Sequence, residues 1–178
     1  MTARRLAAAF LLGSAWITSA GSQALRLDPH LDLPESAATA GWNGLSDPSS
    51  QFDLDRARKG GLTAAAIALF APQGAPDAAR QFELKDAAIH AIADRNPQRA
   101  GFARSPADVR RIVASGRFAV IESILNAAAL GDDLAAFDRW HARGVSIVGF
   151  VHAGHNQFAD SSRPLLVLGE GPARHHGL

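Results

Sequence analysis

The chain has 178 residues, and its 18 lysines and arginines against 17 aspartates and glutamates give a formal net charge of +1. This near-neutral balance argues against the basic surface that nucleic-acid binding requires. The chain also contains no cysteine, which excludes disulfides, so its stability must come from a packed core or a bound metal.

Residues 1–24 have the layout of a secretory signal peptide. Arg4 and Arg5 precede an apolar run over residues 6–17, and small residues stand at −3 and −1 of a possible cleavage site after Ala24. The run is about a dozen residues long, too short to span a bilayer comfortably. We therefore expect an exported protein, periplasmic or secreted, with residues 25–178 as its mature domain. An uncleaved N-terminal membrane anchor is the alternative.

The mature chain alternates between short apolar runs, typical of strands, and segments with helical spacing of apolar residues. In chain order we predict a strand (26–33), a loop (36–51), a helical turn (53–59), a strand (62–70), two helices (76–95 and 105–116), a strand (117–125), a helix (132–144) and a strand (145–152). This order indicates an α/β fold with a parallel sheet.

Local signals support several of these elements. The apolar run 62–70 is typical of a strand buried on both faces. Ser105 is a plausible N-cap, Pro106 suits the first helical position, and Gly116 suits the helix end. No G-x-G-x-x-G follows the first strand, which disfavours a dinucleotide-binding sheet. Another doubly wound sheet and a (β/α)8 barrel both fit the pattern.

Polar residues stand at the carboxyl ends of the predicted strands. His30 and Asp32 are two apart, so in a strand their side chains point to the same side. An imidazole and a carboxylate are both normal zinc ligands. The pair therefore predicts half of a metal site, with a polar edge on an ordinary strand as the alternative.

The segment 151–162 is a second polar cluster, directly after a predicted buried strand. It contains His152, His155, Asn156 and Asp160. Such a loop could bind substrate or metal, or it could simply cover the sheet end.

Glu122 is a carboxylate inside an apolar strand, which is costly unless the group is paired or bound to a metal. The alternative is a strand-end carboxylate in water. His90 and His141 fall in predicted helices, where we expect surface or packing roles.

Three segments together resemble the membrane dipeptidases, also called renal dipeptidases, a family of zinc metallopeptidases. HLDLP (30–34) looks like the family's opening motif on the first barrel strand. GVSIVGFVHAGHNQFADSSRP (144–164) is similar to its block of turn, strand, histidine and Ala-Asp-Ser. SPADVRRIVASGRFAVIESI (105–124) is a looser match to its helix and following strand.

The resemblance implies a (β/α)8 barrel with a two-zinc centre that hydrolyses dipeptides. On this basis His30 and Asp32 bind the first zinc, and His152 contacts the polar end of the substrate. A water held between the metals attacks the peptide carbonyl, so no side-chain nucleophile is needed.

Two departures from the family pattern affect the expected site. Alignment without gaps back from His152 and Gly144 puts Leu125 at the position of the family's metal-bridging glutamate, and Glu122 lies three residues earlier. The family chain is also about twice this length, as full barrels are. We therefore expect the N-terminal half of a barrel, which would pair with a second copy or with a C-terminal half.

Three hypotheses follow for function. The chain is an exported zinc dipeptidase, a truncated and inactive relative without a complete two-zinc site, or a non-enzymatic module that binds a peptide or small polar ligand.

Overall fold

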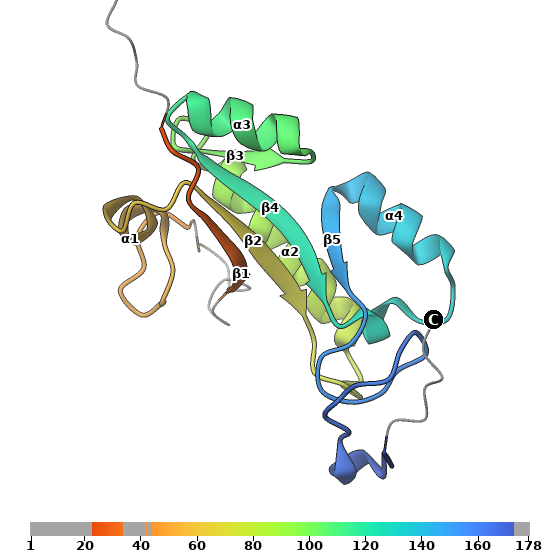
Figure 1. Ribbon diagram of the computed structural model, residues 1–178. Helices are drawn as coiled ribbons and strands as arrows, with labels where there is room; N and C mark the ends of the chain where they lie inside the picture. The colour runs from red at the N-terminus through yellow and green to blue at the C-terminus, as the bar shows by residue number, and fades with distance from the viewer. Residues whose placement is uncertain (1–22, 34–41, 43, 173–178) are drawn as a thin grey trace, which may run out of the picture.

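The computed structural model describes residues 23–33, 42 and 44–172 (Figure 1). The predicted signal peptide therefore lies outside the described residues, except for Gln23 and Ala24. Within the described ranges no helix has the length and apolar character needed to cross a membrane.

Among the described residues, five parallel strands form one sheet: β1 (Leu27–Asp32), β2 (Ala64–Phe70), β3 (Ala100–Ala103), β4 (Phe118–Leu125) and β5 (Val145–Gly149). β1 pairs with β2, and β2 pairs with β4 along its whole length. β3 and β5 share the far edge of β4. β3 takes its first half and β5 its second half. The alternating α/β pattern with a parallel sheet is thus confirmed.

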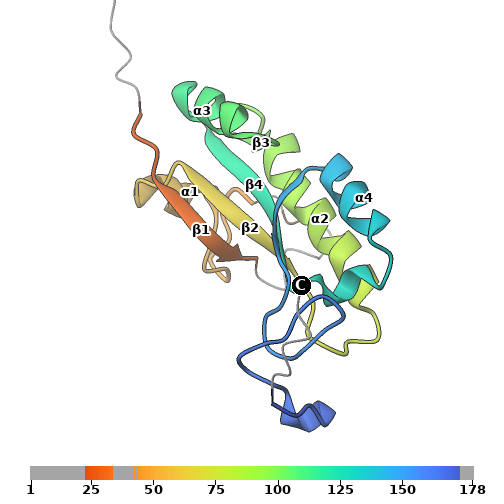
Figure 2. The same ribbon diagram turned by 45° about the vertical axis from the view of Figure 1, so that its right-hand side comes forward.

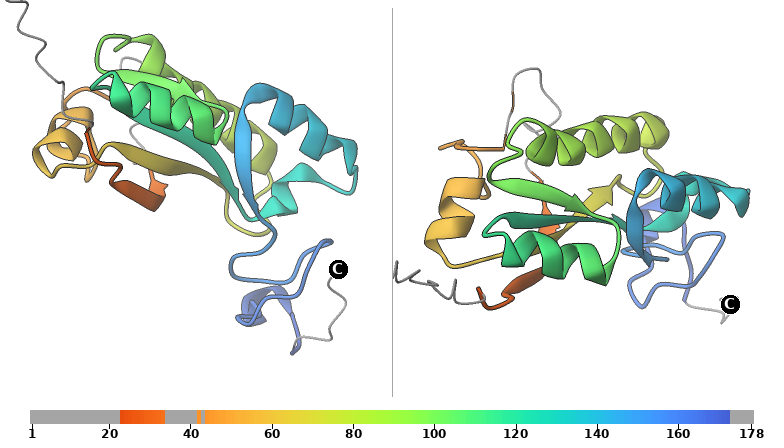
Figure 3. Two further views of the ribbon diagram at one scale, coloured as in Figure 1. Left: turned by 45° about the horizontal axis from the view of Figure 1, so that its top comes forward. Right: turned by 90° about the horizontal axis from the view of Figure 1, so that it is seen from above.

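In the described part of the chain, four α-helices flank the sheet: α1 (Leu54–Lys59), α2 (Ala78–Asp94), α3 (Pro106–Ala114) and α4 (Ala135–Arg143). Two 3-10 turns, η2 (Ala127–Leu130) and η3 (Leu166–Leu168), follow β4 and β5. Seen from above, α2 and α3 lie on opposite sides of the sheet (Figure 3). The carboxyl ends of β1, β2, β4 and β5 point away from α3, whereas β3 leads directly into α3 (Figures 1 and 2).

Successive side chains of β2 and β4 point to opposite faces of the sheet, and so they contribute to two apolar cores. Ile67 and Val120 face α2, whose buried residues include Phe82 and Ile89. The alternate residues of the two strands pack with Ile112 and Val113 of α3. β2 is buried over nearly its whole length, as its apolar run predicted. Residues 64–68 of β2 are all alanine or isoleucine. These compact apolar side chains let helices pack on both faces.

Two details differ from the sequence prediction. β3 was missed, because its four residues AGFA are too few to show a period. β5 was predicted as a buried strand, but Ser146 and Ile147 are exposed. β5 pairs only with β4 among the described strands, so one side of it has no neighbour.

α1 is held by a buried carboxylate at its start. Asp53 is the N-cap and accepts hydrogen bonds from the backbone N–H groups of Arg56 and Asp47, at 2.8 and 3.1 Å, and from Arg56 Nε at 2.9 Å. Burial opposes ionisation, but these donors outweigh it and hold the pKa of Asp53 below its usual 3.8.

Asp53→Ala is expected to lower the free energy of unfolding by about 2 kcal/mol, because three donors lose their acceptor. Urea unfolding measures it. Since the folded-state pKa of Asp53 is depressed, its stabilisation is present above pH 3.8 and is lost as pH falls through the lower folded value. Asp53→Asn keeps a capping oxygen without the charge, so it should flatten this acid limb. An unchanged limb in Asp53→Asn would contradict the assignment.

Candidate functional site

Three of the polar residues that the sequence singled out, His30, Asp32 and His152, lie at the carboxyl end of the sheet. Partners in a parallel ladder project to the same face, and Asp32 pairs with Ala68, which pairs with Ser123. Leu125 lies two residues beyond Ser123 and so projects to that face too. This face is opposite to α2.

His30 and Asp32 converge as their spacing predicts. His30 Nε2 lies 3.8 Å from Asp32 Oδ2, with side chains 49% and 65% exposed. The backbone N–H of His30 donates to the Asp28 carboxylate at 3.0 Å, which fixes the local chain. Two ligand atoms of suitable chemistry thus open toward solvent from the edge strand β1, where an ion and a ligand can reach them.

His152 lies just past β5, in the segment that hangs below the sheet in Figure 1. Its exposed ring meets the ring of Phe70 edge-on, with centroids 5.3 Å apart. Phe70 is the last residue of β2, so His152 lies over the same end of the sheet as His30 and Asp32. The Ser161 hydroxyl donates to the His152 carbonyl at 2.8 Å and steadies the backbone there.

Asn126 fastens the segment that carries His152 to the end of β4. It has a positive φ of 76° and is buried. Its side-chain oxygen accepts from Ala128 N at 3.2 Å and from Asn156 Nδ2 at 3.0 Å, and its Nδ2 donates to Gln73 Oε1 at 3.1 Å. Sequence reasoning missed this residue. The available signal was an asparagine directly after a strand, because asparagine tolerates left-handed backbone.

His155 is occupied by backbone groups. Its Nδ1 accepts from Ser161 N at 2.9 Å, and its Nε2 lies 2.9 Å from the carbonyl of Gly171. Asp160 Oδ1 lies 3.6 Å from the same Nδ1. With both nitrogens engaged, His155 organises the loop and does not serve as a free ligand.

Glu122 does not join His30 and Asp32. It pairs with Ile67 in the ladder and so projects to the α2 face, where it is fully buried. The alternative of a carboxylate in water is therefore wrong. Its Oε2 lies 3.7 Å from Nε2 of His90, which is half-buried and stacked on Phe102, with ring centroids 4.1 Å apart.

The charges of this inner group perturb one another. Burial raises the pKa of Glu122, and the Glu122 carboxylate raises the pKa of His90 against the lowering effect of burial. Asp86, one helical turn before His90, lies 3.7 Å from its Nε2. His90, expected at the surface or in packing, is thus the nitrogen member of a buried polar cluster.

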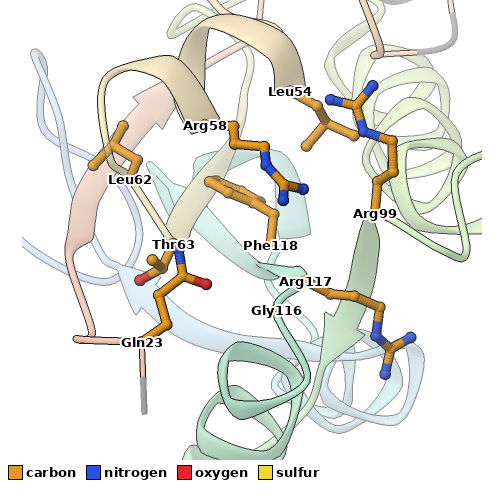
Figure 4. A pocket seen from close by; sticks show the side chains of 9 residues that line it. All are labelled: Gln23, Leu54, Arg58, Leu62, Thr63, Arg99, Gly116, Arg117 and Phe118. Carbon is orange, nitrogen blue, oxygen red and sulfur yellow. The ribbon is translucent and has the colours of Figure 1, made fainter. Parts of the chain in front are cut away.

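The hollows of the structure include two that lie away from the strand carboxyl ends. A water-sized cavity of about 20 Å³ opens at the amino ends of β2 and β4, and Arg58, Arg99 and Arg117 surround it (Figure 4). An apolar groove of about 320 Å³ runs on the face opposite α2. Its lining includes Leu27, Val109, Ile121 and Ile147. Barrel active sites lie at the other end of the strands, so neither hollow is the candidate site.

The strand-end residues fit a metal ion only in part. A catalytic zinc normally has three protein ligands. His30 and Asp32 supply two, and the only three-ligand group among the described residues is the one formed by Asp86, His90 and Glu122 on the other face. Leu125 projects to the face of Asp32 but carries no ligand atom.

Comparisons with known proteins identify the family of this chain. The family model for the membrane dipeptidases, peptidase family M19, matches residues 20–177. The structure of the probable dipeptidase PvdM from Pseudomonas aeruginosa is 37% identical, with a TM-score of 0.76 over 83% of this chain and 40% of its own. The comparison with curated proteins gave no match.

Two further solved structures share the fold at lower identity. Dipeptidase AC, a metallopeptidase of family M19, is 22% identical with a TM-score of 0.67, over 78% of this chain and 46% of its own. A metallopeptidase from Rhodobacter sphaeroides, liganded with a phosphinate mimic of the dipeptide L-Ala-D-Ala, is 21% identical with a TM-score of 0.66, over 76% and 48%. The chain thus spans less than half the length of these proteins, and its fold is the N-terminal half of their barrel.

Asn126→Ala should loosen the segment that carries His152. It removes three hydrogen bonds and places alanine at a positive φ, so we expect about 2–4 kcal/mol less stability by urea unfolding. Amide hydrogen exchange should rise most over residues 150–161. Asn126→Gly relieves the backbone strain but not the lost hydrogen bonds, so it should cost less. Unchanged exchange in both variants would show that Asn126 does not anchor the segment.

Proposed function

Because this chain belongs to the membrane dipeptidase family, we propose that it hydrolyses the peptide bond of dipeptides with a metal-activated water. One observation carries the proposal. His30 and Asp32 converge at the carboxyl end of the sheet, which is the catalytic end of a barrel, and they are open to solvent.

His30 and Asp32 would hold the ion through an imidazole nitrogen and a carboxylate oxygen, and we propose zinc. Once bound there, the ion would supply a water of lowered pKa and would polarise the substrate carbonyl. His152 lies over the end of β2 against Phe70, with an exposed ring that can hydrogen-bond a polar end of the dipeptide. Asn126 holds the backbone of that segment in place.

A second candidate function rests on Leu125. This residue shares the face of Asp32 at the position of the family's bridging glutamate, and leucine cannot ligate a metal. A chain that binds one ion weakly through two ligands could bind dipeptides without hydrolysing them. This is the inactive relative, and a stable chain that binds without turnover would distinguish it.

Export and assembly are proposed on separate grounds. Residues 1–24 have the composition of a signal peptide, which supports a periplasmic or secreted location. The apolar groove opposite α2 and the exposed Ile147 of β5 support pairing of this face with a second copy or with a C-terminal half barrel.

Dipeptide turnover by the full chain with added zinc tests the first proposal. L-Ala-D-Ala hydrolysis should disappear with a chelator and return with zinc. His30→Ala and Asp32→Asn should each lower kcat/KM by at least about 100-fold, since each removes a ligand. His152→Gln should mainly raise KM. A folded, zinc-supplemented chain without any turnover would refute hydrolysis and favour the second candidate.

Leu125→Glu separates the two candidates. A carboxylate on the face of Asp32 supplies a third ligand, so we expect zinc affinity by calorimetry to rise at least about 10-fold, with a gain in turnover. Leu125→Gln is the matched control, because it adds a polar side chain without the charge. The gain should vanish when His30→Ala is added. Equal affinity in the Glu and Gln variants would place residue 125 outside the site.

A further inference from the structure

A second cluster of ligand-type side chains lies on the α2 face, and the proposed hydrolysis does not use it. Asp86 and His90 are four residues apart on α2, so both point from one side of the helix toward β4. Glu122 of β4 points back at them. One ligand atom from each of the three residues lies within 4.8 Å of the others. The sheet separates this cluster from His30 and Asp32.

The oxygens of this cluster lack partners. Glu122 has no exposed surface, yet neither of its carboxylate oxygens has a hydrogen bond, and the same is true of Asp86 Oδ1. His90 Nε2 lies 3.7 Å from both residues, which is too long for a hydrogen bond. Buried carboxylate oxygens are almost always hydrogen-bonded or metal-bound, so three orphaned oxygens around one point call for an occupant.

The surroundings hold the three side chains in place. Arg143 of α4 contacts Asp86 Oδ2 at 2.6 Å and also binds Glu83, which leaves Asp86 Oδ1 turned toward the cluster. The ring of Phe102 lies flat on His90, tilted by 20°. Outer contacts of this kind orient the ligands of metal sites. His90 is 27% exposed, which gives an ion a route from solvent.

Charge and ligand chemistry favour a cation over a water molecule. Arg143 balances Asp86, but Glu122 has no cation in contact other than His90. One imidazole nitrogen and two carboxylate oxygens form the ligand set of first-row divalent transition ions, including zinc, cobalt and manganese. Calcium and magnesium prefer oxygen ligands alone.

We propose that Asp86, His90 and Glu122 bind one divalent first-row transition ion, which ties α2 to β4. This site is separate from the proposed dipeptidase site and has a structural role. It accounts for a buried glutamate in the central strand that neither core packing nor catalysis explains.

Cobalt(II) titration of the full chain tests the inner site. The parent carries His30→Gln and Asp32→Asn, so that the strand-end ligands are absent. We expect one equivalent to bind, with visible d–d absorption, and the melting temperature to rise by about 5 °C or more at saturating metal. Both readouts are independent of hydrolysis. The inner site can therefore be confirmed or refuted whatever the outcome for the dipeptidase proposal.

Two variants in this parent locate the ligands. Glu122→Gln is isosteric and removes a buried charge, so it should fold while weakening cobalt affinity at least 10-fold. His90→Gln should do the same from a partly exposed position. Asp94→Asn, one turn beyond His90 on the same helix and exposed, is the matched control and should leave the affinity unchanged within twofold.

Each outcome decides the proposal. One-equivalent binding that is lost in both ligand variants and kept in Asp94→Asn supports it. A folded parent that binds no cobalt overturns it, and leaves water or a proton shared by His90 and Glu122 as the occupant. Binding that survives both Glu122→Gln and His90→Gln also overturns it, because the ion would then lie elsewhere.

Discussion

The pairing of β4 with three other strands is the constraint on which the rest of this structure depends. β2 takes one edge of β4, while β3 and β5 divide the other. This register sends Ser123 and Leu125 to one face, and Val120, Glu122 and Ile124 to the other. A slip of one residue would exchange the two sets, so the strand can neither rotate nor shift without burying the wrong side chains.

The two faces of β4 serve different chemistry as a result. At the carboxyl end of the sheet, His30, Asp32 and His152 are open to solvent. On the α2 face, Glu122 is sealed under the helix with His90 and Asp86. The first set is accessible and short of ligands. The second has three ligand-type side chains and restricted access. Accessibility suits a substrate, whereas enclosure suits an ion that stabilises the fold.

Hydrogen bonds in the loops after β4 and β5 fix the backbone of the candidate site. Asn126 ends β4 with a left-handed turn and holds Asn156, and Ser161 holds the carbonyl of His152. Both ring nitrogens of His155 contact backbone groups of the same segment. A segment without regular secondary structure is thereby fixed over the end of β2, so the position of His152 depends on side-chain hydrogen bonds rather than on the sheet.

The sequence by itself determined the alternation of strands and helices, the start of α3 at Ser105 and Pro106, and the convergence of His30 with Asp32. These depend on periods of two and 3.6 residues and on short-range capping, which are local in the chain. The family resemblance, confirmed by the match over residues 20–177, also came from local motifs.

Only the tertiary structure decided the place of β3, the exposed edge at β5, the role of Asn126 and the meeting of Glu122 with His90 and Asp86. Those features join residues that are distant in the sequence, such as Glu122 with His90, and no local pattern encodes which helix a strand residue will face.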